Sequence, residues 1–477
     1  MSPTALSTTT TDAPGSSMHA PPLVAADITR ATTRPLATPT RARLRTADIA
    51  TVATAITMLV VGLWARDGGL SDLAEGGTTM WTSLARITGL TASGAGLAGL
   101  YLVARPKALE QAYGIDRLFI WHRILGETMA VLVGLHIATS LVAWQADLGW
   151  WPAVRELTGG AADTATAAVG ALLVLVVTLS SLRSVRRRMA YETWYFLHLT
   201  AYVGLALSFF HQISLGRTVG QGATRWLWIG LHVAIAVGLA VGRWGRLALA
   251  AMRPLEVLDM TPLNDDTVAM RIGGPNLVHI DADAGQFFVL RPRAPRLWWQ
   301  AHPYSLSDAP STNGLRFTIK ARGDASAAVT RLRPGTKVIV EGPYGAHTPD
   351  DLIGHKVLLI AGGVGISPVR SLLERLGEDA EPIVLIRARH DDELVHLDEI
   401  RTLAARTNGR VHVLVGPTAR LAVRDPFAAA RLRQIAPDIL ERRALLCGPE
   451  RLLHAGRAGL RAAGVPAAHI HYERPWW

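Results

Sequence analysis

Four histidines in two long apolar segments are the residues of this chain whose type and spacing most strongly indicate chemistry. His122 and His136 are 14 positions apart in the first segment, and His198 and His211 are 13 positions apart in the second. Because an α-helix rises about 1.5 Å per residue, these spacings correspond to roughly 21 and 20 Å. Ionisable side chains in hydrocarbon are costly and usually functional, and neutral imidazole is a common ligand of haem iron. The pattern therefore predicts two haems, one near each face of a membrane.

The rotation of the four side chains around their helices is less regular than their spacing. At about 100° per residue, His136 returns to within about 40° of His122, whereas His211 lies about 140° from His198. A bend, a bulge or differently rotated haems must accommodate the second pair. His232 is alone in the last apolar segment, and we expect it to be a core histidine that is hydrogen-bonded to a neighbouring carbonyl.

Six apolar segments approach or exceed the length of a membrane-spanning helix, which is roughly 20 residues for a hydrocarbon core of about 30 Å. They are Ile49 to Ala65, Ile87 to Ala104, Leu118 to Trp144, Thr164 to Leu182, Trp194 to Ile213 and Trp226 to Val241. The sequence therefore predicts a bundle of six helices that crosses the membrane.

Basic residues are concentrated in alternate connections between these segments, and such an excess is typical of cytoplasmic loops. They are Arg41, Arg43, Arg45, Arg105, Lys107, Arg183, Arg186, Arg187, Arg188, Arg243, Arg246 and Arg253. We therefore predict a multi-pass protein of the cell membrane with both termini in the cytoplasm. The third and fifth segments then run in parallel, so that His122 and His198 share an inner haem while His136 and His211 share an outer one.

The composition excludes several other classes of protein. The net charge of +11 arises largely from loop arginines, and the second half has no basic stripe interleaved with aromatic residues, so we predict no nucleic-acid partner. Cys447 is the one cysteine in the sequence, which excludes an internal disulfide and an iron–sulfur cluster of the chain's own. Residues 1–46 are rich in Thr, Pro and Ala, and we expect a disordered cytoplasmic tail there.

After Arg253 the sequence changes from long apolar runs to short alternating ones, which predicts a β-rich domain. Its expected strands include Thr267 to Ile272, Gln286 to Leu290, Leu315 to Lys320 and Lys337 to Glu341. A buried strand, Lys356 to Ala361, then leads through a glycine-rich turn into an amphipathic helix, Val369 to Leu376. This succession is typical of the opening of a dinucleotide-binding unit, where glycines let the backbone approach a pyrophosphate at the helix N-terminus.

Several short motifs follow one another in the second half of the chain. They are His302-Pro303-Tyr304-Ser305-Leu306-Ser307, Lys320-Ala321-Arg322-Gly323-Asp324-Ala325-Ser326, Gly342-Pro343-Tyr344-Gly345, Gly362 to Pro368, Cys447-Gly448-Pro449, and Glu473 before two tryptophans. In order and spacing they resemble the motifs of ferredoxin–NADP reductase-type flavoproteins. Together with six spans and two histidine pairs, the chain from about residue 48 onward resembles the ferric reductase and NADPH oxidase family of transmembrane flavocytochromes b.

The resemblance implies a multi-domain fold. After the tail (1–46) we expect a six-helix transmembrane bundle (47–253), a β-barrel FAD-binding domain (254–354) and an α/β parallel-sheet NAD(P)-binding domain (355–477). It implies an oxidoreductase that passes electrons from cytoplasmic NAD(P)H through FAD and two b-type haems to a small-molecule acceptor on the far side. Nicotinamide gives two electrons as hydride and haem iron takes one at a time, so a flavin must stand between them. Oxygen, a ferric chelate, a quinone or a partner protein are all open as acceptors.

The resemblance also implies roles for individual residues. Tyr304 packs against the flavin, and Ser305 forms a hydrogen bond near N5, the atom that receives the hydride. His302 stands where soluble relatives usually have Arg. The other residues expected to bind the flavin nucleotide are Pro303, Lys320, Gly323, Asp324 and Ser326. Those expected to bind the nicotinamide nucleotide are Gly362, Gly363, Gly365, Pro368, Cys447, Gly448 and Pro449. Cys447 is expected beside the hydride-transfer point, and the alternative is a buried small apolar residue.

The C-terminus departs from the family pattern, which often ends with Glu, a spacer and an aromatic residue that covers the flavin. Here Glu473 is followed by Arg474, Pro475, Trp476 and Trp477, and we expect one of the two tryptophans to cover the flavin ring. With Ser305 and Cys447, these tryptophans complete the expected catalytic set.

Two features near the expected cofactors have alternative interpretations. Arg387 and Arg389 follow a predicted strand and could bind the 2′-phosphate of NADPH, although acidic residues come directly after them. We therefore favour NADPH over NADH. Arg123 and Glu127 either form a pair on the helix surface or leave Arg123 for a haem propionate.

Two rival functions are a membrane-anchored flavin reductase without haem and a six-span channel or transporter with a nucleotide-sensing domain. The first leaves the paired histidines unexplained, and the second leaves the flavin motifs unexplained as well. Membrane lipid is an expected partner of all three, and the sequence gives no indication of the oligomeric state.

Overall fold

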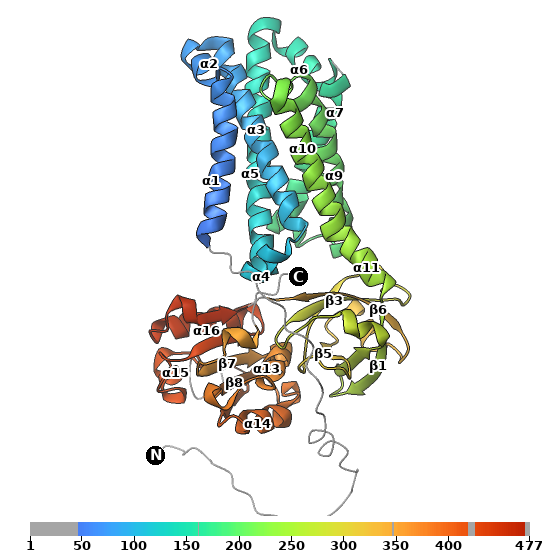
Figure 1. Cartoon of the computed structure of the whole chain (residues 1–477), viewed down its shortest axis with the longest axis vertical. Coiled ribbons are helices and arrows are strands. Elements are labelled where there is room, and N and C mark those ends of the chain that lie inside the picture. Colours follow the sequence, from blue (N-terminus) through green and yellow to red (C-terminus); the bar gives the residue numbers. More distant parts are fainter. Residues whose placement is uncertain (1–45, 161, 346–347, 418–424, 473–477) are drawn as a thin grey trace, which may run out of the picture.

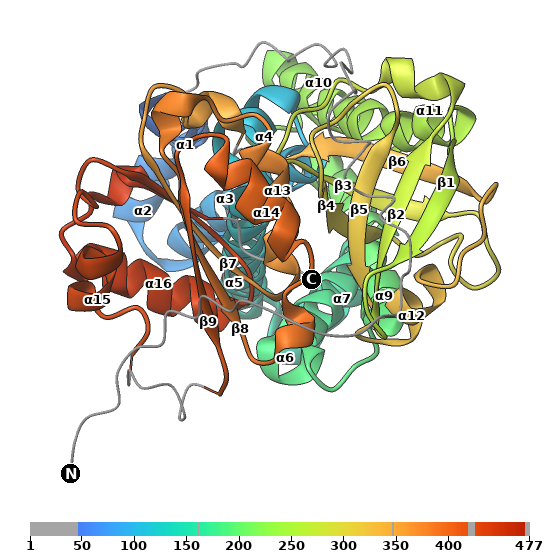
Figure 2. The same ribbon diagram turned by 90° about the horizontal axis from the view of Figure 1, so that it is seen from below.

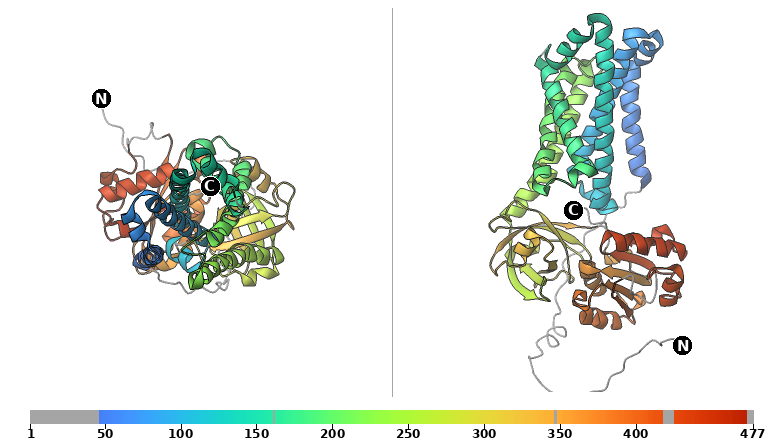
Figure 3. Two further views of the ribbon diagram at one scale, coloured as in Figure 1. Left: turned by 90° about the horizontal axis from the view of Figure 1, so that it is seen from above. Right: turned by 180° about the vertical axis from the view of Figure 1, so that it is seen from behind.

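The computed structural model describes residues 46–160, 162–345, 348–417 and 425–472. A long helical bundle stands above two domains that lie side by side (Figures 1 and 3). Residues 1–45 of the expected tail lie outside the described residues, and so do Glu473, Trp476 and Trp477.

The bundle is built from long helices joined by short helical connections. The long helices are α1 (Thr46–Arg66), α3 (Gly77–Val103), α5 (Ile115–Leu148), α7 (Ala162–Ser181), α9 (Tyr191–Ser214) and α10 (Gly222–Leu239). The connections are α2 (Gly69–Glu75), α4 (Lys107–Tyr113), α6 (Trp150–Gly159) and α8 (Arg183–Arg186). A π-helical segment (Ala240–Gly245) and α11 (Arg246–Met252) continue α10 toward the β-sheet domain that follows.

Within the described residues, four helical segments are long and apolar enough to cross a membrane. They are Arg117–Leu148, Asp163–Ser181, Tyr191–Ser214 and Gly222–Met252. Composition therefore supports the last four of the six predicted spans. The predicted first and second spans fall on α1 and α3, of which α1 contributes the shorter apolar stretch Ala53–Arg66. Helix α3 is rich in Gly and Thr and carries Arg86, so its composition is less apolar although it lies beside α5 in the bundle (Figure 1).

Glycine allows the bundle helices to approach one another closely. A Cβ atom on Gly204 of α9 would lie 3.0 Å from the carbonyl oxygen of Gly170 on α7. A Cβ atom on Gly96 of α3 would lie 3.0 Å from the sulfur of Met129 on α5. Small residues at such positions are typical of helix contacts within membranes, where close packing replaces the hydrophobic effect.

The domain below α11 is an antiparallel half-barrel, where a β-barrel was expected. Its strands are β1 (Leu255–Pro262), β2 (Thr267–Gly273), β3 (Phe287–Pro292), β4 (His302–Ser305), β5 (Leu315–Lys320) and β6 (Lys337–Tyr344). In the described part of the chain they form one sheet in the order β4-β3-β6-β1-β2-β5. Phe288, Leu290 and Phe317 fill its buried face, and the short helix α12 (Asp324–Val329) follows β5.

The last domain contains a parallel sheet, as predicted. Its strands are β7 (Val357–Gly362), β8 (Ile383–Ala388), β9 (Arg410–Val415), β10 (Arg443–Cys447) and β11 (Ile470–Tyr472), in the order β11-β10-β7-β8-β9 among the described residues. Alternate residues of β7 point to opposite faces. Leu359 packs toward α13 (Ile366–Leu373) and α14 (Leu397–Ala405), whereas Leu358 packs toward α15 (Ala429–Ile435) and α16 (Glu450–Ala462), as Figure 2 shows for the helices.

A buried ion pair joins the bundle to the half-barrel. Glu341 of β6 accepts a hydrogen bond from Arg243 of the π-helical segment at 3.1 Å and one from Arg291 of β3 at 2.7 Å. Beside it, Ile115 of α5 packs with Phe287 and other apolar residues of the half-barrel. The π-helical segment thus directs a bundle arginine onto the domain that follows.

Replacing Glu341 with Ala should destabilise this junction, because two guanidinium groups would be left buried without their carboxylate. The expected cost is about 3 kcal/mol. Lys337→Ala on the same strand is the matched control, since Lys337 pairs with Glu256 at an exposed site and should contribute less than about 1 kcal/mol. Thermal unfolding of the detergent-purified chain measures both, and equal losses for the two variants would contradict a structural role for the buried pair.

Candidate functional site

The bundle brings the four predicted histidines together as two facing pairs. The ring centroids of His122 on α5 and His198 on α9 are 6.0 Å apart, and those of His136 and His211 are 6.2 Å apart. Two imidazoles on opposite sides of one metal ion have centroids about 6 Å apart, because a metal–nitrogen bond is about 2 Å and the nitrogen is about 1.2 Å from its ring centroid. Both pairs have this separation.

Backbone carbonyls of α3 orient two of the imidazoles. Nδ1 of His122 lies 3.2 Å from the carbonyl oxygen of Gly99, and Nδ1 of His136 lies 2.8 Å from that of Ala85. A carbonyl can only accept, so each Nδ1 carries the proton and each Nε2 is left as the nitrogen that can bind a metal. A Cβ on Gly89 would lie 2.9 Å from Nδ1 of His136, so glycine is needed for this close approach.

A serine hydroxyl orients the third imidazole. Ser181 donates its hydroxyl hydrogen to the carbonyl of Val177 at 2.7 Å and accepts from Nε1 of Trp194 at 3.2 Å. Its remaining lone pair faces Nδ1 of His198 at 3.3 Å, so this imidazole also carries its proton on Nδ1. The ring of Trp194 lies against the His198 ring with centroids 5.0 Å apart.

Among the residues that the structure describes, each of these sites is formed by two imidazoles without a third His, Cys, Asp or Glu side chain. In the parts of the chain that the structure describes, no group of three or more His, Cys, Asp or Glu side chains could hold a metal ion. A bare zinc ion would need four ligands, whereas haem brings its own ring of nitrogens and takes axial ligands from the protein. The donor set therefore fits haem.

The structure accommodates the uneven spacing on α9 without a break in that helix. Helix α9 runs continuously from Tyr191 to Ser214. The planes of the inner ring pair cross at 74° and those of the outer pair at 33°, so the pairs are rotated differently. Arg123 forms the helix-surface alternative, an exposed pair with Glu127 at 3.7 Å. His232 has the predicted core role, with Nδ1 2.9 Å from the carbonyl of Trp228.

The expected flavin-contact residues His302–Ser305 form β4, beside β3. Burial raises the pKa of Tyr304. Burial, and then the positive charge of Arg291, lowers the pKa of His302. Within the described residues, Nε2 of His302 is buried with no hydrogen-bond partner. A buried polar atom of this kind usually marks a place that a ligand or water completes, so the strand fits a bound flavin nucleotide.

The expected phosphate-binding residues are partly engaged by the protein itself. Nζ of Lys320 is 3.3 Å from Asp266 and 3.7 Å from Glu393, so acidic groups balance its charge. Oγ of Ser326 accepts from the backbone N–H of Gly323 at 3.0 Å and holds the turn that leads into α12, which begins at Asp324. Ser326 is therefore part of the loop's own structure, whereas Lys320 pairs with acidic residues of other segments.

Arg322 is a charged residue of this loop that our sequence-based assignment passed over. Its side chain is exposed, and its Nη2 atom lies 3.5 Å from where a Cβ on Gly363 would be. The guanidinium therefore lies beside the glycine turn of the NAD domain, where it can neutralise a phosphate. Its position inside the motif that begins at Lys320 could have identified it as a site residue from the sequence.

The glycine turn after β7 meets the turn after β10. A Cβ on Gly365 would lie 2.3 Å from the carbonyl oxygen of Cys447, and one on Gly448 would lie 2.9 Å from that of Gly362. Gly363 and Gly448 also have positive φ angles of 56° and 150°. The chain order reverses between β7 and β10, and ligands of open parallel sheets bind at such a point.

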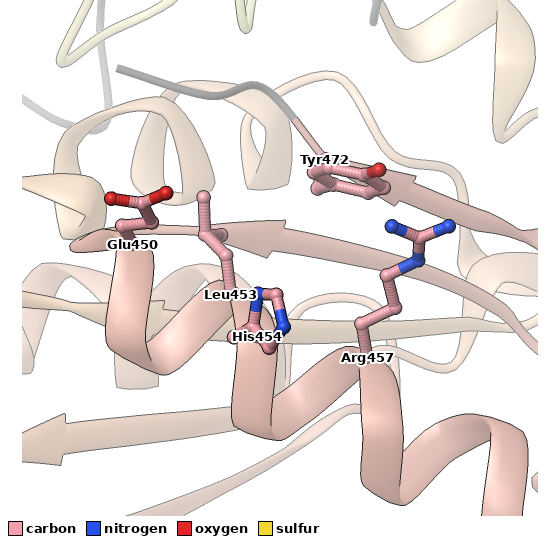
Figure 4. Close-up of a pocket in the computed structure, with 5 residues that line it drawn as sticks. All are labelled: Glu450, Leu453, His454, Arg457 and Tyr472. Carbon is pink, nitrogen blue, oxygen red and sulfur yellow. The ribbon is translucent and has the colours of Figure 1, made fainter. Parts of the chain in front are cut away.

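The remaining residues expected at the nicotinamide nucleotide flank these turns. Pro368 is buried in the first turn of α13, Pro449 precedes α16, and Cys447 is half-buried at the end of β10. A separate small pocket lies further along α16, where Arg457 covers the ring of Tyr472 at 5.0 Å (Figure 4). The other side chains that line it are Glu450, Leu453 and His454. None of these five was predicted as a site residue.

The two arginines considered for the 2′-phosphate differ in their surroundings. The guanidinium of Arg387 donates to the backbone carbonyls of Ala388, Leu414 and Gly416, which secures the ends of β8 and β9. The side chain of Arg389 is exposed, and its backbone N–H donates to Glu393 at 2.8 Å. Arg389 is therefore the better placed of the two to meet a nucleotide.

A partly buried cluster that the sequence did not reveal holds the half-barrel and the parallel-sheet domain together. Glu399 of α14 accepts hydrogen bonds from Arg370 of α13 at 2.7 Å and from Arg316 of β5 at 2.9 Å. Arg370 also donates to the carbonyl of Ser307 at 3.0 Å, two residues beyond Ser305. The cluster thus ties the flavin strand to the helix that follows the glycine turn.

His396 completes this cluster from the N-terminal end of α14. Nδ1 of His396 donates to Glu399 at 2.9 Å, and Nε2 accepts from the hydroxyl of Thr318 at 2.8 Å. Burial lowers the pKa of His396, and the hydrogen bond to Glu399 opposes this only in part. Burial alone would raise the pKa of Glu399, but the hydrogen bond from His396 and the charges of Arg370 and Arg316 outweigh it and hold that pKa below its usual range.

Comparisons with protein families find three matches in sequence order. Residues 88–209 match "Ferric reductase like transmembrane component", residues 252–348 match "FAD-binding domain" and residues 359–457 match "Oxidoreductase NAD-binding domain". The first range includes His122, His136 and His198 and ends two residues before His211.

Curated relatives match less than half of this chain. The ferredoxin reductase component of 3-ketosteroid-9-alpha-monooxygenase from Mycolicibacterium smegmatis is 32% identical over 230 residues, 46% of this chain and 64% of that protein. A flavohemoprotein from Bordetella pertussis is 33% identical over 210 residues, 40% of this chain and 52% of that protein. The chain thus spans less than two thirds of the length of these relatives.

A solved structure of flavohemoglobin from Malassezia yamatoensis with bound FAD and heme is also similar. It is 18% identical, with a TM-score of 0.42, and the match covers 85% of this chain and 98% of that one.

The His396 cluster predicts a pH dependence of stability. The folded-state pKa of His396 is lowered, so below about pH 6.5 the unfolded chain binds a proton that the folded chain does not. The free energy of unfolding should therefore decrease as the pH is lowered from 7 to 5. In this range the depressed pKa of Glu399 keeps that carboxylate charged. His396→Asn, which tolerates the positive φ at this position, should flatten the dependence. Urea unfolding of the full chain in detergent measures it, and an unchanged slope in the variant would contradict the assignment.

Proposed function

We propose that this chain is a transmembrane oxidoreductase of the ferric reductase and NADPH oxidase type, since it joins a ferric reductase-like transmembrane component to FAD-binding and NAD-binding domains. It takes electrons from NAD(P)H in the cytoplasm and delivers them to an acceptor on the far side of the membrane. The observation that carries this proposal is the stack of two imidazole pairs, with centroid separations of 6.0 and 6.2 Å, above the FAD domain.

We assign the four histidines as axial ligands of two b-type haems. His122 and His198 are the inner pair, because α5 begins in contact with Phe287 of the half-barrel. His136 and His211 are the outer pair. When bound, the haems would supply one-electron redox centres and FAD would convert hydride into single electrons. The chain's own part is to fix three of the four imidazoles through Nδ1.

The basic residues at one end of the bundle indicate its orientation in the membrane. Arg105, Arg183, Arg243 and Arg246 lie in or beside α4, α8 and the π-helical continuation of α10, the connections on the side of the FAD domain. An excess of basic residues marks the cytoplasmic side. We assign α1 and α3 as the remaining two of six spans, with both termini in the cytoplasm. Their small residues, which lower hydropathy, also let α3 approach α5.

In the half of the chain after the bundle, we propose that Tyr304 and Ser305 contact the flavin ring. We propose that the nicotinamide binds where the turns at Gly362 and Cys447 meet. The cluster around Glu399 sets the distance between these two parts, because Arg370 bridges from the glycine-turn helix to the carbonyl of Ser307, two residues beyond Ser305. Trp476 or Trp477, outside the described residues, is assigned to cover the flavin. The half-buried Cys447 thiol lies at the junction.

The proposed acceptor is a small molecule, either oxygen or a ferric chelate. Either acceptor would need only access to the exposed edge of the outer haem. The haem-free flavin reductase and the nucleotide-gated channel do not explain why three of the imidazoles are fixed with Nδ1 protonated and face a partner ring.

Single substitutions of the histidines test the proposal by haem content. His136→Ala should lower the haem count of the purified chain from two to one, since one axial ligand remains without its partner. His232→Ala is the matched control, because its imidazole bonds a carbonyl within its own helix, and both haems should be kept. Haem extraction with a reduced-minus-oxidised spectrum measures the count, and flavin content reports folding. A His136→Ala chain with two haems would contradict the assignment.

The coenzyme preference is tested at Arg389. We expect Arg389→Ala to raise the KM for NADPH about tenfold, which is about 1.4 kcal/mol and within the range of one charge-assisted contact to phosphate. The KM for NADH should not change. Arg387→Ala should instead lower stability and weaken both coenzymes alike, because its guanidinium secures strand ends. Equal effects of Arg389→Ala on both coenzymes would exclude a role in recognising the 2′-phosphate.

A further inference from the structure

We propose that the loop between β3 and β4, residues 293–301, is a membrane-docking surface of the FAD domain that places Trp298 in the interface of the inner leaflet. The inference rests on the contacts, exposure and charge of the loop and does not depend on the proposed electron transfer.

Two contacts place this loop at the level where the helices leave the membrane. The ring of Trp299 lies against that of Phe196, near the start of α9, with centroids 6.1 Å apart. Nη2 of Arg293 donates to the carbonyl of Ala251, near the end of α11. Both helices belong to segments that are long and apolar enough to span a membrane. Figure 1 shows β3 on the side of its domain that faces the bundle.

Successive side chains of the loop point in opposite directions. Leu297 is only 3% exposed and packs into the core of the half-barrel. The next residue, Trp298, is 67% exposed. Arg296 is exposed as well and has a positive φ of 67°, which turns the chain at this point. The fold therefore holds the loop firmly by Leu297 and presents the indole of Trp298 outward.

The other strongly exposed tryptophans mark the two ends of the bundle. Within the described residues, the remaining tryptophans that are more than half exposed are Trp150, Trp151, Trp226 and Trp244. They lie in α6, at the start of α10 and in the π-helical segment, which are all ends or connections of apolar helices. Tryptophan is enriched at both membrane–water interfaces, where its ring is apolar and its N–H is wet. Trp298 extends this pattern into the FAD domain.

The charge of the loop fits lipid head groups. Residues 293–301 contain Arg293 and Arg296 and no acidic residue, and both arginines are exposed. The cytoplasmic leaflet is anionic and attracts basic segments beside the spans. Indole next to arginine at the end of a span is therefore suited to a lipid interface.

Docking of this loop would fix the flavin strand relative to the bilayer. The loop leads directly into β4, which begins at His302. Nη1 of Arg291 donates to the carbonyl of Trp299 at 3.2 Å, and the same guanidinium pairs with Glu341 and through it with Arg243. Protein contacts on one side and lipid on the other thus hold the strand in place.

Quenching of tryptophan fluorescence tests the proposal. The full chain and Trp298→Phe are placed in nanodiscs of phosphatidylcholine and phosphatidylglycerol, and the difference between them isolates one of 14 tryptophans. Lipids brominated near the glycerol backbone should quench this difference signal, and aqueous iodide should leave it nearly unchanged. Arg401→Trp is the control for an indole in water, because Arg401 is 57% exposed on α14, on the side of its domain away from the bundle (Figure 1).

The control should show the opposite behaviour, with quenching by iodide and none by brominated lipid. If Trp298 behaves like the control, the loop faces water and the proposal is wrong. Shielding of Trp298 from both quenchers would also overturn it, because another protein surface, such as a second copy of the chain, would then cover the indole.

Discussion

The hydrogen bond on Nδ1 of each oriented histidine is the interaction on which the rest of this structure depends. Carbonyls of Gly99 and Ala85 and the hydroxyl of Ser181 hold three imidazoles by Nδ1, which leaves Nε2 of each as the nitrogen that can bind a metal. An imidazole in hydrocarbon without such a partner would be costly and free to rotate. The carbonyls come from α3, so that helix must lie against α5. Its glycines and its lower hydropathy follow from this close approach.

Below the bundle, buried charges fix how the domains are joined. Glu341 lies between arginines from the bundle and the half-barrel, and Glu399 lies between arginines from the half-barrel and the nucleotide domain. Charges buried this way impose one geometry, because a shifted domain would leave a guanidinium without its carboxylate. A chain of charge clusters therefore runs from the span end to the glycine turn, and it aligns the predicted cofactor sites.

Local patterns predicted the parts of this molecule, and long-range contacts escaped them. The spacing of His122 and His136 was sufficient to predict the pairs, because the two helices run in parallel. Residues separated by similar numbers of positions then lie at similar depths in both helices. Strand β5 alternates apolar and polar residues along its length, whereas β1 was not predicted because two successive apolar residues, Val257 and Leu258, interrupt its alternation and four of its eight residues are exposed. Helix α13 begins at Ile366, inside the predicted turn. Arg370, His396 and Glu399 belong to no motif, and only the fold brings them together. Helix α3 has the length of a membrane span, but Arg86 makes its composition less apolar than that of a typical span.

Electron transfer across the membrane through the histidine stack can be measured in sealed vesicles. The chain is reconstituted without oxygen, with its soluble domains outward and ferricyanide trapped inside, and NADPH and FAD are then added outside. We expect the trapped ferricyanide to be reduced, and we expect His136→Ala to abolish this while the flavin is still reduced. Flavin reduction in the wild-type chain with the interior ferricyanide left oxidised would contradict electron transfer by this route.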